Sequence, residues 1–450
     1  MVLKDHGRRS DLAASGGPPA GRTTVAQAGR WGPIGWLQLL GPGLITGASD
    51  DDPSGIGTYS QVGSQFGLGL LWTALFTFPL MSAVQELCAR IALQTGVGLG
   101  VSLRRKFPSF IVAIAIGGLL IANTINVGAD LGAVAAGGSL LTRGHLSGLW
   151  LVVPVAALII GLQWVATYAT IFKIFKWLTL ALFAYVITAV FAHPSLAEVV
   201  KATLVPHIEL SRDYVTALVA VLGTTISPYL FFWQASSEVD EMKAAGKMTE
   251  SERRGVRRAE LRAARVDIMI GMFFSQLVMY FIILTSGTVL HTHGRTGIQT
   301  ADQAAAALAP LAGPFAFVVF AVGMIGAGLL AIPILTGSAT YALTEFLGLK
   351  GSLAVRPRYR PTFYLILTLA TVAGVLINAL HLNPIAALFW TAVINGVVAP
   401  PLLFLIVLLG TDRAVMGSKA SGPLSLTLTS IATAFMTVAA TVMLWTMLVH

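Results

Sequence analysis

The sequence Asp50-Asp51-Asp52-Pro53-Ser54-Gly55 interrupts an apolar stretch that is long enough to cross a bilayer. A carboxylate in the hydrocarbon centre costs at least about 2.5 kcal/mol, so such a run indicates a functional site. Proline has no backbone N–H and glycine tolerates unusual dihedral angles, so a regular helix is not expected to continue here. Broken backbone at membrane depth is stable only where it faces protein or a water-filled cavity. Carboxylate oxygens beside freed carbonyl groups therefore predict a cation site in a membrane protein.

The composition fits an integral membrane protein and excludes several other classes. Of the 450 residues, 55% are hydrophobic and 11% are charged, whereas soluble domains are about 25% charged. The net charge is +9, but the basic residues lie in short segments between apolar stretches, which indicates membrane topology and not a nucleic-acid groove. The single cysteine, Cys88, excludes an intramolecular disulfide. No Ser/His/Asp grouping, zinc motif or phosphate loop occurs at a shared depth, so neither an enzyme nor a bound cofactor is expected.

Apolar segments of about 20 residues or more, the length that a ~30 Å hydrocarbon core requires, recur along the chain. Eleven spans are predicted, at 36–66, 69–95, 108–140, 148–165, 168–192, 213–241, 265–290, 312–346, 361–380, 384–409 and 423–449. With the N-terminus inside, 24 of the 29 Lys and Arg residues fall in cytoplasmic segments. This bias favours insertion in the cytoplasmic (inner) membrane with the C-terminus outside. Residues 1–33 are predicted to form a disordered cytoplasmic tail, and residues 411–450 a loop and the eleventh span.

A second interruption, Gly223-Thr224-Thr225-Ile226-Ser227-Pro228-Tyr229, lies in the sixth span. Paired Pro/Gly interruptions at matching positions of two halves point to the binding site of inverted-repeat transporters. The separation of five spans predicts a transporter core over 34–410, with repeats at about 36–192 (spans 1–5) and 213–409 (spans 6–10). The expected fold is all-α, with spans 1 and 6 broken. The alternative is that each proline only kinks its helix for packing.

Short motifs extend from the first break through the second span. They are Gly41-Pro42-Gly43, Asp52-Pro53, Gly63-Ser64-Gln65-Phe66-Gly67 with Leu71-Trp72, then Gln85, Ala89-Arg90 and Thr95-Gly96. Together they resemble the opening of the Nramp family of divalent-metal transporters. The resemblance covers residues 36 to about 410. It implies the LeuT-like fold, with a metal ion bound between the unwound parts of spans one and six, and a monomer in the bilayer is expected.

Two departures from the family pattern bear on which ion is carried. The family motif Asp-Pro-Gly-Asn here reads Asp52-Pro53-Ser54-Gly55, which puts Gly55 in place of the Asn ligand. The family motif Met-Pro-His here reads Ser227-Pro228-Tyr229, so a hydroxyl replaces a thioether that favours softer transition metals. This pattern resembles the Nramp-related magnesium transporters. An all-oxygen site suits Mg²⁺, which keeps several of its waters, and it also permits Mn²⁺.

The resemblance and the breaks together assign the candidate metal ligands. Asp52 is the first candidate, and capping of the second half-helix is its alternative role. Ser227 offers a hydroxyl, with a bond to its own helix as the alternative, and Thr224 offers its carbonyl. Further candidates are Ser54, Asp51 and Asn395.

Alternatives remain for two of these further candidates. Asn395 could instead make an interhelical hydrogen bond. Asp51, like its neighbour Asp50, either holds the outer shell of a hydrated ion or lines its entrance, or it simply faces an external vestibule.

Obligatory proton coupling is not expected from the resemblance. Coupled family members share a span-six His and a span-three acidic pair, but here Tyr229 replaces the His and Ala133 replaces the second acid. Asp130, Tyr229 and Asp50 are the candidate coupling or pathway residues. Two rival functions remain: a proton-coupled Mn²⁺/Fe²⁺ symporter, and a LeuT-like amino-acid transporter, whose substrate carboxylate three Asp residues would repel.

Overall fold

The computed structural model describes residues 41–166, 180–355, 357–417 and 423–449. The predicted tail over 1–33 and part of the predicted fifth span lie outside these residues. All regular secondary structure in the described ranges is helical, which confirms the all-α prediction. Seven described segments are long and apolar enough to cross a membrane: Ser109–Leu141, Arg212–Ala244, Arg258–His293, Ala301–Leu347, Pro361–Asn378, Pro384–Thr411 and Leu424–Leu448. The count of eleven spans stays a prediction.

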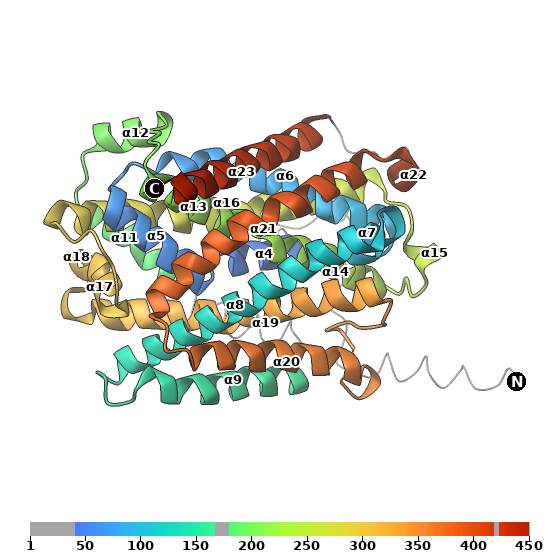
Figure 1. Cartoon of the computed structure of the whole chain (residues 1–450), viewed down its shortest axis with the longest axis horizontal. Helices are drawn as coiled ribbons and strands as arrows, with labels where there is room; N and C mark the ends of the chain where they lie inside the picture. The colour runs from blue at the N-terminus through green and yellow to red at the C-terminus, as the bar shows by residue number, and fades with distance from the viewer. Residues whose placement is uncertain (1–40, 167–179, 356, 418–422, 450) are drawn as a thin grey trace, which may run out of the picture.

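The helices follow the chain in the order that Figure 1 labels. The first half holds α4 (Pro42–Asp50), α5 (Pro53–Phe66), α6 (Trp72–Thr95), α7 (Leu99–Lys106), α8 (Ser109–Leu141), α9 (Gly148–Val165), α11 (Ala184–Phe191) and α12 (Leu196–Leu204). The second half holds α13 (Arg212–Thr225), α14 (Pro228–Ala244), α15 (Glu250–Arg253), α16 (Arg258–Val289), α17 (Ala301–Ala305), α18 (Ala309–Ala312), α19 (Ala316–Leu347), α20 (Pro361–Asn378), α21 (Pro384–Thr411), α22 (Arg413–Met416) and α23 (Pro423–Val449).

Proline and glycine mark several helix ends. A proline begins α5, α14, α20 and α21, where its missing N–H costs nothing and its fixed φ suits the first turn. Gly96 and Gly348 end α6 and α19 at φ +73° and +74°, in the left-handed region that glycine adopts without strain. The chain therefore breaks spans one and six with the same residue type that starts ordinary helices elsewhere.

Loops that the sequence analysis places on the cytoplasmic side lie together at one end of the bundle, with α7, α15 and α22 (Figure 1). Arg105 of α7 pairs with Glu250 of α15 at 2.6 Å, and Lys106 pairs with Asp412. The Arg105 guanidinium holds the pKa of the Glu250 carboxyl below its usual value by hydrogen bonding. The short helices α12, α17 and α18 lie at the opposite end (Figure 1).

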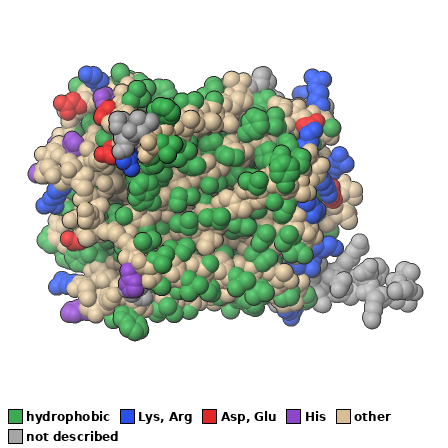
Figure 2. All heavy atoms as spheres, in the orientation of Figure 1, with side chains coloured by type: hydrophobic (Ala, Val, Ile, Leu, Met, Phe, Trp, Pro, Cys, Tyr) green, Lys and Arg blue, Asp and Glu red, His purple; other side chains and the backbone are tan. Residues whose placement is uncertain are grey.

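The outer surface between these ends is apolar. Figure 2 shows hydrophobic side chains across the middle of one face, with most Lys and Arg at its ends. Large exposed apolar residues include Ile114 (71%), Trp150 (80%) and Trp445 (66%). An apolar surface of this extent marks contact with another apolar phase, and a bilayer accounts for the band together with its charged ends.

The broken helix α4–α5 packs along the continuous helix α16 without intervening side chains. A Cβ atom on Gly47 would lie 2.2 Å from the backbone carbonyl of Gly271. At the start of α4, the Asp267 carboxylate of α16 accepts backbone hydrogen bonds from Gly41 at 2.8 Å and Gly43 at 2.7 Å. Small residues allow such close approach between helices in membranes. This packing holds α4, and with it the start of the first break, against α16.

The second broken helix, α13–α14, packs in a similar way on α21. A Cβ atom on Gly223 would lie 2.0 Å from the Ala392 carbonyl oxygen, and one on Gly396 would lie 2.5 Å from the Val219 carbonyl oxygen. Each break therefore has one neighbouring helix in backbone contact.

Candidate ion-binding site

The first break separates α4 from α5 at Asp51 and Asp52. Because Pro53 has no N–H, the Ser49 carbonyl loses its normal i+4 helical donor. Asp52 is the N-cap of α5, and its Oδ1 accepts hydrogen bonds from the Gly55 N–H and the Ser54 hydroxyl, both at 2.7 Å. The capping role weighed for Asp52 is therefore present, and it occupies one carboxylate oxygen.

The other Asp52 oxygen, Oδ2, faces α8. It accepts one hydrogen bond, from the Asn126 side-chain amide at 3.2 Å. Asp52 is 1% exposed and Asn126 is 0% exposed, so both groups are buried. An ionised carboxylate has about four acceptor positions in total, so Oδ2 keeps capacity for a further partner.

Asp50 and Asp51 turn toward α16 instead. The Ser275 hydroxyl donates to Asp50 Oδ2 at 2.5 Å and lies 3.5 Å from Asp51 Oδ1. Both carboxylates are buried, at 0% and 5% exposure. Among the described residues, no group of three or more His, Cys, Asp and Glu side chains is arranged to hold a metal ion. Asp50 and Asp51 thus face α16 whereas Asp52 faces α8, and the three carboxylates do not form one chelating cluster.

The second break separates α13 from α14 at Ile226 and Ser227. Pro228 has no N–H, so the Thr224 carbonyl loses its helical donor in the same way. The Ser227 hydroxyl lies 2.8 Å from both the Gly223 and Thr224 carbonyl oxygens, and its single proton serves one of them at a time. Ser227 therefore makes the bond to its own helix that was weighed against a ligand role. Its oxygen lone pairs remain able to accept.

The two breaks are in direct contact. The Tyr229 hydroxyl of α14 donates to the Ser49 carbonyl at 2.9 Å, which replaces the donor that Pro53 lacks. A Cβ atom on Gly55 would lie 3.2 Å from Thr224 Oγ1, so the absence of a side chain at Gly55 lets α13 approach α5. The predicted convergence of the two interruptions is present in the fold.

Several buried oxygens near the breaks make no hydrogen bond to any described residue. They include Asp50 Oδ1, Asn126 Oδ1 and the amide oxygen of Asn395. Asp130 belongs to the same region, because its carboxylate interacts with Asp52 and with the Ser54 backbone. Buried polar atoms normally have partners, so a group of unpaired acceptors suits a cation or ordered water. The interhelical hydrogen bond weighed for Asn395 does not occur within the described residues.

Sequence reasoning missed Asn126, Ser275 and the Thr224 side chain. Asn126 could have been found, because it lies one helical turn before Asp130 and therefore on the same face of α8. The role of Ser275 depends on the packing of α4 against α16, for which the local sequence around Ser275 gives no signal. The Thr224 hydroxyl was passed over because only its carbonyl matched the family pattern.

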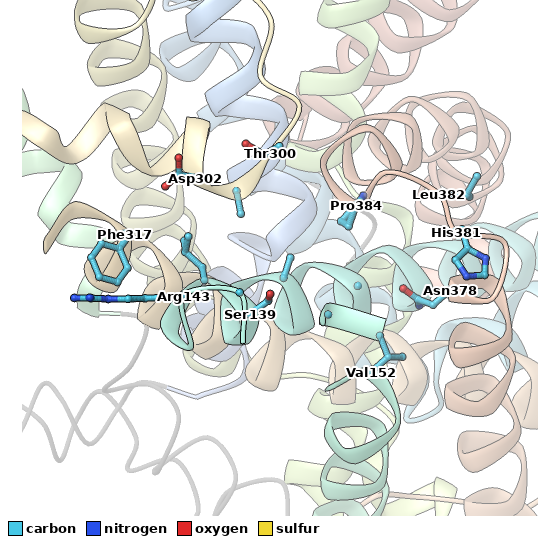
Figure 3. A pocket seen from close by; sticks show the side chains of 16 residues that line it. Ser139, Arg143, Val152, Thr300, Asp302, Phe317, Asn378, His381, Leu382 and Pro384 are labelled. Carbon is cyan, nitrogen blue, oxygen red and sulfur yellow. The ribbon is translucent and has the colours of Figure 1, made fainter. Parts of the chain in front are cut away.

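Two cavities lie away from the breaks. One, of about 780 Å³, is lined by residues of α8, α9, α17, α19 and the α20–α21 loop. Figure 3 shows Arg143 and Phe317 toward one side of it and Asn378 and His381 toward the other. The second, of about 740 Å³, is lined by residues such as Gly67, His207 and His291. Neither cavity is lined by residues of 50–55 or 223–229, so neither forms the candidate ion site.

The architecture defines the class first. Apolar transmembrane-length helices, two broken helices in contact and a buried carboxylate at the contact make this an α-helical integral membrane protein. The family model described as "Natural resistance-associated macrophage protein-like" matches residues 43–446, and the chain belongs to this Nramp family. The match confirms the resemblance and extends it beyond residue 410, into the last predicted span.

Similar proteins support this assignment. A relative named divalent metal cation transporter MntH, from Pectobacterium carotovorum, is 29% identical over 294 residues, which is 65% of this chain and 68% of the relative. A protein of the same name from Klebsiella pneumoniae is 27% identical over the same shares of the two chains.

Two solved structures share the fold. A point mutant of the Eremococcus coleocola manganese transporter superposes with a TM-score of 0.67 at 17% identity, covering 90% of this chain and 86% of the other. Mhp1, a nucleobase-cation-symport-1 family transporter, superposes with a TM-score of 0.54 at 14% identity, covering 91% and 92%. At these identities the likeness concerns the fold alone.

Proposed function

We propose that this protein carries divalent cations across the cytoplasmic membrane by alternating access, as a secondary transporter or uniporter. The observation that carries the proposal is the buried Asp52 carboxylate at the contact of two broken helices, with Oδ2 open to a further partner. An intramembrane carboxylate of this kind marks an ion pathway. Family membership and the relatives named divalent metal cation transporters support the same function.

Within this function we propose Mg²⁺ as the favoured ion, with Mn²⁺ permitted. The polar side chains at the two breaks offer oxygen atoms that can coordinate a metal ion, namely those of Asp52, Ser54, Thr224 and Ser227. Oxygen ligands suit Mg²⁺ and Mn²⁺, and Mg²⁺ needs only one or two carboxylates because it retains water. Asp51 and Asn395 remain lesser candidate ligands, and Asp50 a candidate pathway residue. The name of the Eremococcus coleocola protein favours Mn²⁺ as the competing candidate.

The proposed mechanism does not require proton movement. Tyr229 occupies the position of the expected His. Its hydroxyl donates a hydrogen bond to the Ser49 carbonyl, which gives it a structural role. Asp130 has no acidic neighbour at Ala133 with which to form a relay. A proton-coupled Mn²⁺/Fe²⁺ symporter is the alternative, and it would have to use Asp130.

The proposed topology has eleven spans, a cytoplasmic N-terminus and an external C-terminus. Loops predicted on one side of the membrane do share an end of the bundle, as the Arg105–Glu250 and Lys106–Asp412 pairs illustrate. A monomer with a 34–410 core of two inverted repeats completes the proposal.

Ion uptake by the purified full-length chain in liposomes tests the function. We expect inward flux of Mg²⁺, and of Mn²⁺ in competition with it, reported by ion-sensitive dyes inside the vesicles. Protein-free liposomes are the control. A rise in melting temperature with amino acids and none with either cation would instead support an organic-solute transporter, because only a bound ligand stabilises.

A further inference from the structure

We propose that Asn126 of α8 is a direct ligand of the transported cation, through its side-chain oxygen Oδ1. This inference rests on the proposed function, since it adds a residue to the same ion site. Asn126 is absent from the candidate ligands that the sequence motifs supply.

The two oxygens of Asp52 have different partners. Oδ1 already accepts from the Gly55 N–H and the Ser54 hydroxyl, which hold it at the N-terminus of α5. Within the part of the chain that the structure describes, Oδ2 accepts from Asn126 alone. A cation that binds Asp52 without uncapping α5 must therefore approach Oδ2, and so must approach the Asn126 amide.

The Asn126 amide has one bonded atom and one unpaired atom. Its Nδ2 donates to Asp52, while its Oδ1 is buried and has no hydrogen-bond partner among the described residues. An unpaired buried amide oxygen is costly unless it meets a donor or a cation. Nδ2 lies 3.2 Å from Asp52 Oδ2. Because Nδ2 and Oδ1 belong to one planar amide and are about 2.3 Å apart, Oδ1 lies no more than about 5.5 Å from Asp52 Oδ2.

Asn126 lies on α8 between two other buried polar residues, Asn123 and Asp130. Asn123, Asn126 and Asp130 follow one another at spacings of three and four, so they lie on one helix face. Asn123 Oδ1 is also buried and unpaired among the described residues, but its Nδ2 donates to the Leu335 carbonyl of α19 at 3.2 Å and not to Asp52. Asn126 is therefore the amide of this face that contacts the break, and Asn123 is a matched control.

The Asn126 oxygen also has suitable ligand chemistry. Amide and carboxylate oxygens are suitable ligands for Mg²⁺ and Mn²⁺. An amide oxygen is a neutral ligand, so Asn126 supplies a coordinating oxygen without changing the net charge of the site. The Asn126 oxygen and Asp52 Oδ2 then form a two-point contact from two different helices, and retained water fills the remaining positions.

Three variants of the chain in detergent test the proposal. Each is titrated with Mn²⁺ and with Mg²⁺, and binding is measured by calorimetry and by the shift in melting temperature. Asn126→Leu is expected to weaken binding at least about tenfold, as the loss of a group at a metal site does. Asn123→Leu, with the same chemical change at equal burial, is expected to bind like wild type. Asn126→Asp keeps an oxygen at Oδ1 and is expected to bind at least as tightly as wild type.

The Asn126→Asp variant separates a ligand from a mere support of Asp52. If Asn126 only donates its N–H to Asp52, a carboxylate there repels Asp52, and binding falls as in Asn126→Leu. That outcome would overturn the proposal, and so would wild-type binding in Asn126→Leu. If Asn126→Leu does not fold, the Asp variant still decides between the two roles. Failure of wild type to bind either ion would instead contradict the proposed function, so the two failures are distinguishable.

Discussion

The two helix breaks use the same device but differ in charge and in the direction of their bonds. In each, a proline removes one helical donor, and a hydroxyl bonds the carbonyl that loses it: Tyr229 for Ser49 and Ser227 for Thr224. The first break carries three carboxylates that reach out to α16 and α8, whereas the hydroxyl of Ser227 turns back on α13. The first break is therefore suited to hold charge, and the second to shape the space around it.

The largest expected effect comes from removing charge at the first break. We predict that Asp52→Ala reduces Mg²⁺ and Mn²⁺ uptake in liposomes to background. Folding should be largely intact, because loss of an N-cap costs only about 0.5–2 kcal/mol. The corresponding change at the second break, Ser227→Ala, should retain measurable uptake. Flux like wild type in Asp52→Ala would remove the central claim about the first break.

Packing offers a second way to compare the breaks. We predict that Gly47→Ala and Gly223→Ala each lower the free energy of unfolding by about 1–3 kcal/mol, since the added methyl group meets backbone atoms of α16 or α21. Gly117→Ala on α8 is the matched control, because a Cβ atom there has no heavy atom within 4 Å. Thermal unfolding in detergent measures all three. Equal melting temperatures for Gly47→Ala and Gly117→Ala would mean that α4 does not pack on α16 as described.

Ion preference should depend on the neutral second break. Ser227→Met fills space and adds a soft sulfur ligand, so we predict weaker Mg²⁺ transport and better relative uptake of Mn²⁺ or Cd²⁺. Competitive uptake of Mg²⁺ against Cd²⁺ measures this shift. Unchanged selectivity in a folded, active variant would show that residue 227 does not face the ion.

Adding Gly55→Asn to Ser227→Met should shift selectivity further in the same direction. The asparagine must displace its neighbours, because a Cβ atom at Gly55 lies only 3.2 Å from Thr224 Oγ1 and 3.3 Å from the Tyr59 ring. Melting temperature therefore has to be measured alongside uptake for the double variant.

The smallest expected effect is on proton movement. Because Tyr229 is engaged with Ser49 and Ala133 replaces an acid, we predict that a pH-sensitive dye inside the liposomes stays silent during metal influx. Acidification that scales with the metal and persists under voltage clamp would contradict this. Its loss in Asp130→Asn would then assign the coupling to Asp130.

The sequence was sufficient to locate both breaks, because proline and glycine act locally on the backbone. It also supplied both roles considered for Asp52 and Ser227, since capping and back-bonding depend on residues within four positions. It did not identify Asn126 as a partner of Asp52, which lies 74 residues away. Such contacts depend on which faces of α8 and α16 pack against the first break, and helix packing angles are not encoded in a short motif.

The hydroxyls of Tyr229 and Ser227, which bond the Ser49 and Thr224 carbonyls, have a consequence for the relation between the transported ion and the protein. At the two breaks, Tyr229 and Ser227 offer a hydroxyl donor to the carbonyl that a proline leaves without one, so we expect this backbone to fold without a bound ion. In structural zinc domains, by contrast, metal binding supplies the folding energy and chelators denature the protein. Here a chelator should leave the helices intact and lower the melting temperature only by the amount that mass action sets. The protein can therefore release the transported ion without losing the stability of its fold.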